Sequence, residues 1–177
     1  MRDIEDKIEN AFFKLLEKNS IEEIDVNKIS SALNFKRQTF YYHYKNIYDL
    51  IASIISKKEI EQASSYEEAI HNLIDFLFLD KDFYQELLGS TAKDILEDKV
   101  SSYLFKFLNN QITDRDLLLD EKKDISRMVS SGISSSLLFL FLNRDYSKEE
   151  LEHKSLVIYN SKYFAMYLEA YKNNRLK

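Results

Sequence analysis

The chain has no proline and only two glycines among its 177 residues. Proline interrupts the hydrogen bonding of a helix, and glycine weakens helices through its conformational freedom. Their scarcity favours long helices joined by short connections. No segment shows the alternation of polar and apolar residues that is typical of strands. The sequence therefore predicts an all-α fold of about nine helices.

The residue types and motifs that the sequence lacks exclude several classes of function. Without cysteine, the chain cannot form a disulfide scaffold, a thiol nucleophile or a cysteine-based zinc site. His43, His71 and His153 lack partners at metal-ligand spacing, and there is no glycine-rich phosphate loop. We therefore expect no enzyme, no cofactor and no metal.

The longest apolar run, Leu137 to Leu142, is too short to cross a bilayer, and the N-terminus has no signal-peptide core. These two features predict a cytoplasmic protein that has no membrane partner.

Short amphipathic segments open the chain. Apolar residues spaced by three and four predict a helix over residues 3–18. Asp25 is a suitable N-cap for a second helix, and Asn34 stands where that helix must end, because asparagine tolerates a left-handed turn. A third helix is expected from Lys36 to Tyr44. Two short helices joined in this way form a helix-turn-helix, which we assign to a DNA-binding domain at residues 1–47.

The rest of the chain, residues 48–177, is predicted to form a second, helical domain. One helix is expected to start near Asn46, and capping-box patterns at Ser65 and Ser147 predict two others. The remaining expected helices cover about residues 80–88, 91–111 and 121–143, and the helix that begins at Ser147 is expected to continue to about residue 173.

A net charge of −5 argues weakly against nucleic-acid binding, but the charge is unevenly distributed. No acidic residue lies between Val26 and Tyr48, a window that contains Lys28, Lys36, Arg37 and Lys45. Such a local basic window matters more to a phosphate backbone than the total charge does.

The side chains of the third helix suit DNA. The first residues of a recognition helix meet base edges in the major groove, where Arg37 and Gln38 could pair with guanine and adenine. Hydroxyl and imidazole donors for phosphates follow at Thr39, Tyr41, Tyr42 and His43, and Lys45 with free N–H groups of the next helix could hold another phosphate. The alternative is a purely structural aromatic patch, although so short a helix cannot bury Tyr41, Tyr42 and Tyr44 together.

The run from Thr39 to Asn46 resembles the recognition-helix signature of TetR-family regulators. The similarity extends over about residues 4–55, and the segment from Arg37 to Tyr44 is also similar to a subgroup that regulates dihydroxyacetone-kinase operons, partly as activators with a protein partner. Three residues depart from the family pattern: Ser30 replaces alanine, Asn34 replaces glycine and Ile47 replaces lysine.

The resemblance implies roles for individual residues. It places Thr39, Tyr41 and His43 on the DNA backbone, and Asn27 and Lys28 on phosphates. The residues nearest the bases would be Lys36, Arg37, Gln38 and Tyr42. Lys45 could replace the phosphate contact that is lost at Ile47.

The resemblance also assigns residues 48–177 to ligand binding and dimerisation. It implies a homodimer in which the last two helices pair with their counterparts. The small residues from Ser130 to Ser136 would allow close approach, although both helices could instead be intramolecular core. A small-molecule effector would bind among the helices of residues 46–111. His71, Tyr103 and Arg127 could anchor it, but each is better explained as core or surface, so no pocket residue is assigned.

The predicted function is sequence-specific regulation of transcription, by a ligand-responsive repressor that binds double-stranded DNA at a palindromic operator. One alternative is an activator that works with a protein partner. The other is a helical interaction module that no longer binds DNA.

Overall fold

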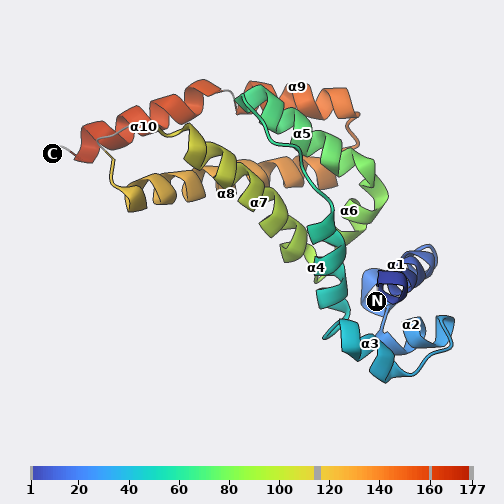
Figure 1. Cartoon of the computed structure of the whole chain (residues 1–177). Helices are drawn as coiled ribbons and strands as arrows, with labels where there is room; N and C mark the ends of the chain where they lie inside the picture. Colours follow the sequence, from blue (N-terminus) through green and yellow to red (C-terminus); the bar gives the residue numbers. More distant parts are fainter. Residues whose placement is uncertain (1, 114–116, 160, 176–177) are drawn as a thin grey trace. The chain divides into compact units, whose positions relative to one another are not determined.

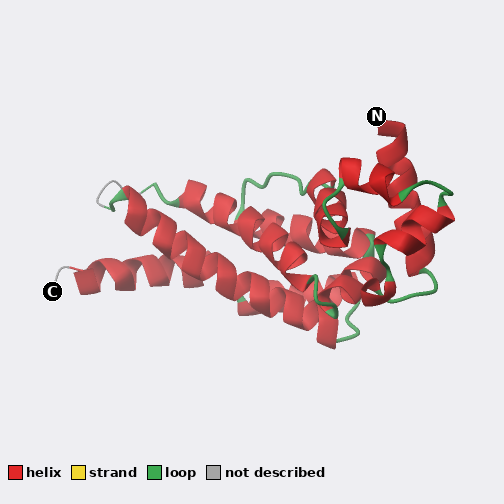
Figure 2. Cartoon of the chain, turned by 90° about the horizontal axis from the view of Figure 1, so that it is seen from below, coloured by secondary structure: helices red, strands yellow, loops and turns green. Residues whose placement is uncertain are grey.

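The computed structural model describes residues 2–113, 117–159 and 161–175. These residues form ten α-helices and one short 3-10 helix, and they contain no strand (Figure 2). The all-α prediction is therefore confirmed. The helix count exceeds the expected one because the last predicted helix is divided.

The chain forms two compact units, and the first consists of Met1–Lys58 together with Glu86–Leu96. The second consists of Glu59–Gln85 together with Glu97–Lys177. This division rests on contacts within the chain, and the expected functional boundary after residue 47 stays a prediction.

The first unit contains the predicted helix-turn-helix (Figure 1). Its elements are α1 (Arg2–Leu16), η1 (Ile21–Glu23), α2 (Val26–Ala32), α3 (Arg37–His43) and α4 (Ile47–Lys57). Helix α1 packs against α2, and α2 packs against α3. The core is formed by side chains with no exposed surface: Ile8, Phe12, Ile29, Phe40, Leu50 and Ile51.

Residues Glu86–Leu96 join the first unit through reciprocal hydrogen bonds with η1. The Ile21 N–H donates to Glu86 Oε1 at 3.2 Å, and the Thr91 N–H donates to Glu22 Oε1 at 2.9 Å. The hydroxyls of Tyr48 and Thr91 also lie 3.1 Å apart, which ties this segment to α4. A stretch distant in sequence therefore completes the first unit.

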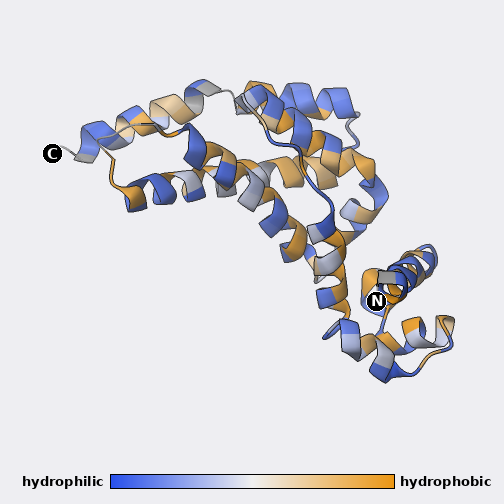
Figure 3. Cartoon of the chain, viewed as in Figure 1, coloured by the Kyte–Doolittle hydropathy of each residue, from blue (hydrophilic) through white to orange (hydrophobic). Residues whose placement is uncertain are grey.

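The second unit is a helical bundle. Its helices are α5 (Tyr66–Leu79), α8 (Leu119–Asn143), α9 (Lys148–Ile158) and α10 (Ser161–Arg175), with parts of α6 (Lys81–Leu88) and α7 (Lys93–Gln111). Helix α9, which is mostly hydrophilic (Figure 3), packs against α5 and also contacts α8. One hydrogen-bond contact and one ion pair join α5 to α9: His71 Nδ1 lies 3.0 Å from Glu152 Oε1, and Lys148 Nζ lies 2.6 Å from Asp75 Oδ1.

The expectation of one helix over about residues 147–173 is wrong, because the chain leaves helical geometry at Tyr159, with φ −121° and ψ 57°. The two pieces have different packing partners. Helix α9 packs against α5, whereas α10 contributes Phe164, Tyr167, Leu168 and Tyr171 to a cluster around Ile112, Leu117 and Ile125. A single straight helix would not reach both surfaces.

Helix α8 is also long and apolar enough to cross a membrane, and within the described ranges it alone meets that criterion. Its core face is nonetheless buried in the bundle, at residues such as Ile125, Ile133, Leu137 and Phe141. Because core helices of soluble proteins meet the same criterion, this helix is weak evidence for a membrane segment.

Candidate nucleic-acid interface

Local hydrogen bonds set the start of α2. The Asp25 carboxylate accepts the Lys28 N–H at 2.8 Å, as expected for an N-cap. This backbone hydrogen bond holds the pKa of the Asp25 carboxyl below its usual range. Asp25 is therefore ionised at neutral pH, and it places one negative charge at the edge of the basic window.

The turn after α2 depends on Asn34, whose φ is 52°. The Phe35 N–H donates to the Ser30 carbonyl at 3.1 Å, and the Asn34 N–H donates to the Ser31 carbonyl at 3.2 Å. This pair of bonds is typical of a helix that ends on a left-handed residue, a place usually taken by glycine. The backbone of this turn therefore directs the chain from α2 into α3.

Helix α3 is held on one side by two aromatic residues. Phe40 is fully buried and Tyr44 almost so, with ring centroids 5.7 Å apart. By contrast, Tyr41 is 50% exposed and Tyr42 is 80% exposed. This exposure opposes a purely structural role for the segment, because neither ring is needed to fill the core.

Most of the predicted DNA contacts are on the surface: Asn27, Lys28, Lys36, Arg37, Gln38, Tyr41, Tyr42 and Lys45. Thr39 is half-buried. His43 differs, because its side chain is only 5% exposed and its Nδ1 lies 3.3 Å from Glu5 Oε1 on α1. The contact of His43 with DNA stays a prediction, and in this structure the Nδ1 side of its ring faces α1.

A depression of about 360 Å³ lies between α2, α3 and the start of α4. Several hydrogen-bond donors line it: Asn27, Arg37, Tyr41, Asn46 and Tyr48. Donors of this kind hold DNA phosphates. Glu22 and Asp25 also line the depression, so it is not uniformly basic.

A second depression lies on another side of α3, where Gln38, Thr39, Tyr42 and His43 meet Ile4. Helix α3 therefore presents two pairs of exposed side chains, and the two members of each pair are separated by one helical turn. Arg37 and Tyr41 face the first depression, and Gln38 and Tyr42 face the second. Arg37 and Gln38 also line one further depression together, beside Asn27 and Lys36, so the two sides meet at the start of the helix.

The start of α4 offers fewer free donors than the sequence led us to expect. The Asp49 N–H donates to Asn46 Oδ1, and the Lys45 N–H donates to Asp49 Oδ2, both at 2.9 Å. The Asp49 carboxylate also adds a negative charge there. On α2, the Lys28 ammonium donates one hydrogen bond to Asn19 Oδ1 at 2.8 Å and keeps further N–H donors for a phosphate.

Glu5, Glu9 and Lys57 support this surface, and the sequence interpretation missed all three. Glu9 Oε1 accepts a hydrogen bond from the Tyr44 hydroxyl at 3.1 Å and also pairs with the Lys57 ammonium near the end of α4. Burial, and then the charge of Glu9, raise the pKa of Tyr44 well above its usual value. The signal lay in the spacing, because Glu5 and Glu9 fall within the apolar stripe that contains Ile8.

No family model and no curated protein matches this chain. Among solved structures, it is similar to the dihydroxyacetone kinase operon activator DhaS, with 20% identical residues and a TM-score of 0.59. The likeness covers 87% of this chain and 92% of that chain. At this identity the comparison establishes a shared fold, which agrees with the predicted all-α architecture.

Proposed function

We propose that this chain is a sequence-specific DNA-binding regulator of transcription. The observation that carries the proposal is the surface of α3, where Arg37, Gln38, Tyr41 and Tyr42 are all exposed within a window free of acidic residues. The similarity to an operon activator supports it.

In this proposal α3 enters the major groove. Arginine and glutamine side chains there distinguish guanine and adenine, each good bidentate pair contributing about 1–3 kcal/mol of discrimination. Asn27, Tyr41 and Lys45 would hold phosphates on either side, which fixes the register of α3 on the duplex.

The regulator would act as a homodimer on a palindromic operator. Several large apolar side chains are exposed on the described parts of the C-terminal helices, among them Met128, Phe139, Leu142, Val157, Ile158 and Met166. Phe139 and Ile158 also line one shallow depression, with Ser135 and Ser136. Pairing of this surface with a second copy would bury apolar area and place two copies of α3 on successive half-sites.

We further propose a cytoplasmic location and a repressor that a small effector releases. Activation is the second candidate, because the similar solved structure is named an activator.

The test is fluorescence anisotropy of the purified full-length chain with its own upstream DNA and with a scrambled duplex, at several salt concentrations. We expect the upstream duplex to bind at least about a thousandfold more tightly, and the affinity to fall steeply with salt. Equal, weak binding of both duplexes would refute the proposal and favour a helical interaction module.

Two matched variants separate recognition from general charge. Arg37→Gln and Lys14→Gln each remove one positive charge from an exposed side chain. We expect Arg37→Gln to weaken specific binding by about tenfold or more, and Lys14→Gln, on α1, to have a much smaller effect. Equal effects would show that Arg37 contributes only to the overall charge.

A further inference from the structure

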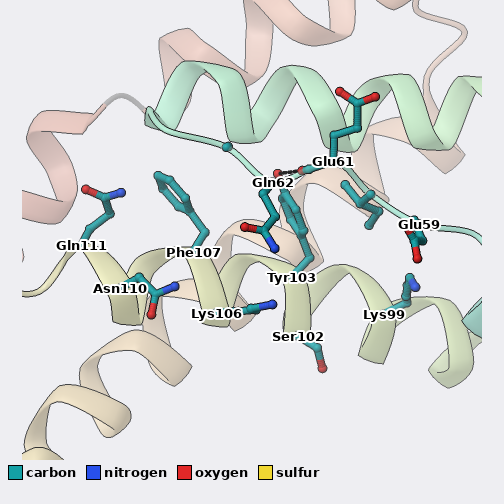
Figure 4. A pocket seen from close by; sticks show the side chains of 12 residues that line it. Glu59, Glu61, Gln62, Lys99, Ser102, Tyr103, Lys106, Phe107, Asn110 and Gln111 are labelled. Atoms are coloured by element: carbon teal, nitrogen blue, oxygen red, sulfur yellow. Dashed lines mark hydrogen bonds between the residues drawn. The ribbon is translucent and has the colours of Figure 1, made fainter.

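A groove in the second unit is separate from the DNA-binding surface. It lies between the extended segment Glu59–Ala63 and one face of α7, and its volume is about 520 Å³ (Figure 4). That size is within the range of small-molecule sites. Lining residues of α7 recur every three to four positions, so they share one side of the helix: Lys99, Ser102, Tyr103, Lys106, Phe107, Asn110 and Gln111.

One carbonyl group holds the two walls of the groove together. The Glu61 carbonyl oxygen accepts the Tyr103 hydroxyl at 2.9 Å and the Asn72 side-chain amide at 3.1 Å. Burial raises the pKa of Tyr103, so its hydroxyl stays a donor at physiological pH. The extended segment is therefore fixed at its centre.

The charges of the groove are arranged unevenly. Figure 4 shows the Glu61 carboxylate pointing away from the groove, and the Glu59 and Lys99 side chains at one end of it. Gln62 points toward α7, and Lys106 lines the groove from α7. Within the described ranges, no carboxylate lies at ion-pair distance from Lys106, so its ammonium group is available to an anionic ligand.

The neighbours of Lys106 complete a set of complementary groups. The carboxamides of Gln62, Asn110 and Gln111 can donate and accept hydrogen bonds, and the rings of Tyr103 and Phe107 supply an apolar wall. An ammonium group binds anionic oxygens strongly, and aromatic rings pack best against flat apolar groups.

We propose that this groove binds a small organic anion with a planar body. A carboxylate or phosphate group would bind Lys106, the carboxamides would bind the polar atoms beside it, and the planar body would pack against Tyr103 and Phe107. Carboxylate and phosphate ligands of this kind share an anionic group attached to a body about the size of an aromatic ring.

Regulation through this groove rests on the proposed function. Segment Glu59–Ala63 is the covalent connection from α4 to α5, so a ligand that contacts both walls would favour one position of that connection. If that position changes DNA affinity, DNA must change ligand affinity by the same factor.

The test is isothermal titration of the full-length chain with benzoate and with phenyl phosphate. Benzamide, the uncharged counterpart of benzoate, is the control ligand. We expect both anions to bind and benzamide to bind far more weakly. Absence of binding by both anions at millimolar concentration, or equal binding of benzamide and benzoate, would overturn the proposal.

Variants then locate the site. Lys106→Gln should weaken both anions by about tenfold, the effect of losing one charged hydrogen bond, and Gln62→Trp should block the groove. Lys154→Gln removes an exposed charge from α9, outside the groove, and should leave affinity unchanged. Unchanged affinity in Lys106→Gln refutes the site.

DNA binding without any probe tests the proposed function separately. Binding of benzoate without binding of the operator would refute the proposed regulatory function and support the anion site. Binding of the operator without binding of either anion would refute the anion site and support the regulatory function. Operator affinity that stays constant at saturating phenyl phosphate would overturn the regulatory consequence.

Discussion

Asn34 allows a quantitative test of the turn that positions α3. Among the described residues, Asn34 is the one non-glycine residue with a positive φ, which is 52°. A left-handed conformation costs a residue with a Cβ atom about 1–2 kcal/mol, and asparagine tolerates it better than alanine does. Because Asn34 is exposed and its side chain makes no hydrogen bond, replacing it changes little except the backbone preference.

The magnitude follows from that preference. We expect Asn34→Ala to lower the free energy of unfolding by about 1 kcal/mol, because alanine bears the full cost of positive φ. Asn34→Gly removes the steric cost but gives the unfolded chain more freedom, so its stability should lie within about 0.5 kcal/mol of the natural chain. A loss of 1 kcal/mol corresponds to a fall in melting temperature of about 2–4 °C for a chain of this size.

Urea unfolding followed by circular dichroism measures both changes, and the unfolding slope shows whether the denatured state has altered. Ser31→Ala is a matched control, because it changes an exposed residue in the last turn of α2 that has ordinary helical geometry. The reasoning is refuted if Asn34→Ala is as stable as Asn34→Gly, or if the alanine variant loses no more stability than the control.

Three further predictions concern other parts of the chain. Glu9→Ala and Tyr44→Phe should each lower the stability of the first unit. The double variant should lose clearly less stability than the sum of the two, because both single changes remove the same Tyr44–Glu9 hydrogen bond. Additive losses in this double-mutant cycle would show that the bond contributes nothing to stability. Since the folded-state pKa of Asp25 is lowered, its carboxylate stabilises the fold above pH about 3.9 and loses that effect as pH falls through the lowered pKa. Asp25→Asn should flatten this acid dependence in thermal melts between about pH 5 and 2, whereas identical pH profiles would contradict the assignment. Phe139→Glu should yield a folded monomer in sedimentation velocity, since Phe139 is 60% exposed in the single chain, and an intact dimer would exclude this surface.

Much of the fold follows from local sequence signals. The N-cap expected at Asp25 and the capping box expected at Ser147 are present, because a cap depends on residues only three positions apart. At Ser65 the side-chain cap is present, but the Glu68 carboxylate accepts from the Ser64 N–H instead of completing the box. The sequence likewise indicates that Asn34 ends α2, because asparagine tolerates a left-handed turn. These signals locate helix starts and ends without information about packing.

The division of the last helix could not be predicted in that way. Tyr159 lies within a pattern of apolar residues that continues through Tyr167 and Leu168, so the periodicity suggests one uninterrupted helix. The break depends on which surfaces α9 and α10 pack against, and those surfaces come from α5 and from Ile112, Leu117 and Ile125, far away in the sequence.

The candidate interface shows the same limit. The sequence identified the exposed tyrosines of α3, because so short a helix cannot bury them all. It did not indicate that His43 faces Glu5, or that Glu9 bonds to both Tyr44 and Lys57, because these partners are 35 to 48 residues apart. The groove beside α7 depends on how an irregular segment lies against a helix, which periodicity does not describe.

The reciprocal bonds between η1 and residues Glu86–Leu96 affect how this protein can be divided for engineering. The chain passes from one unit to the other after Lys58, after Gln85 and after Leu96. A fragment cut at Lys58 would lose the hydrogen-bond partners of Ile21 and Glu22. The helices of the candidate DNA-binding surface therefore do not form a complete unit within residues 1–58. A chimera that transplants this DNA-binding surface onto another body must also carry residues Glu86–Leu96, for instance through a redesigned linker.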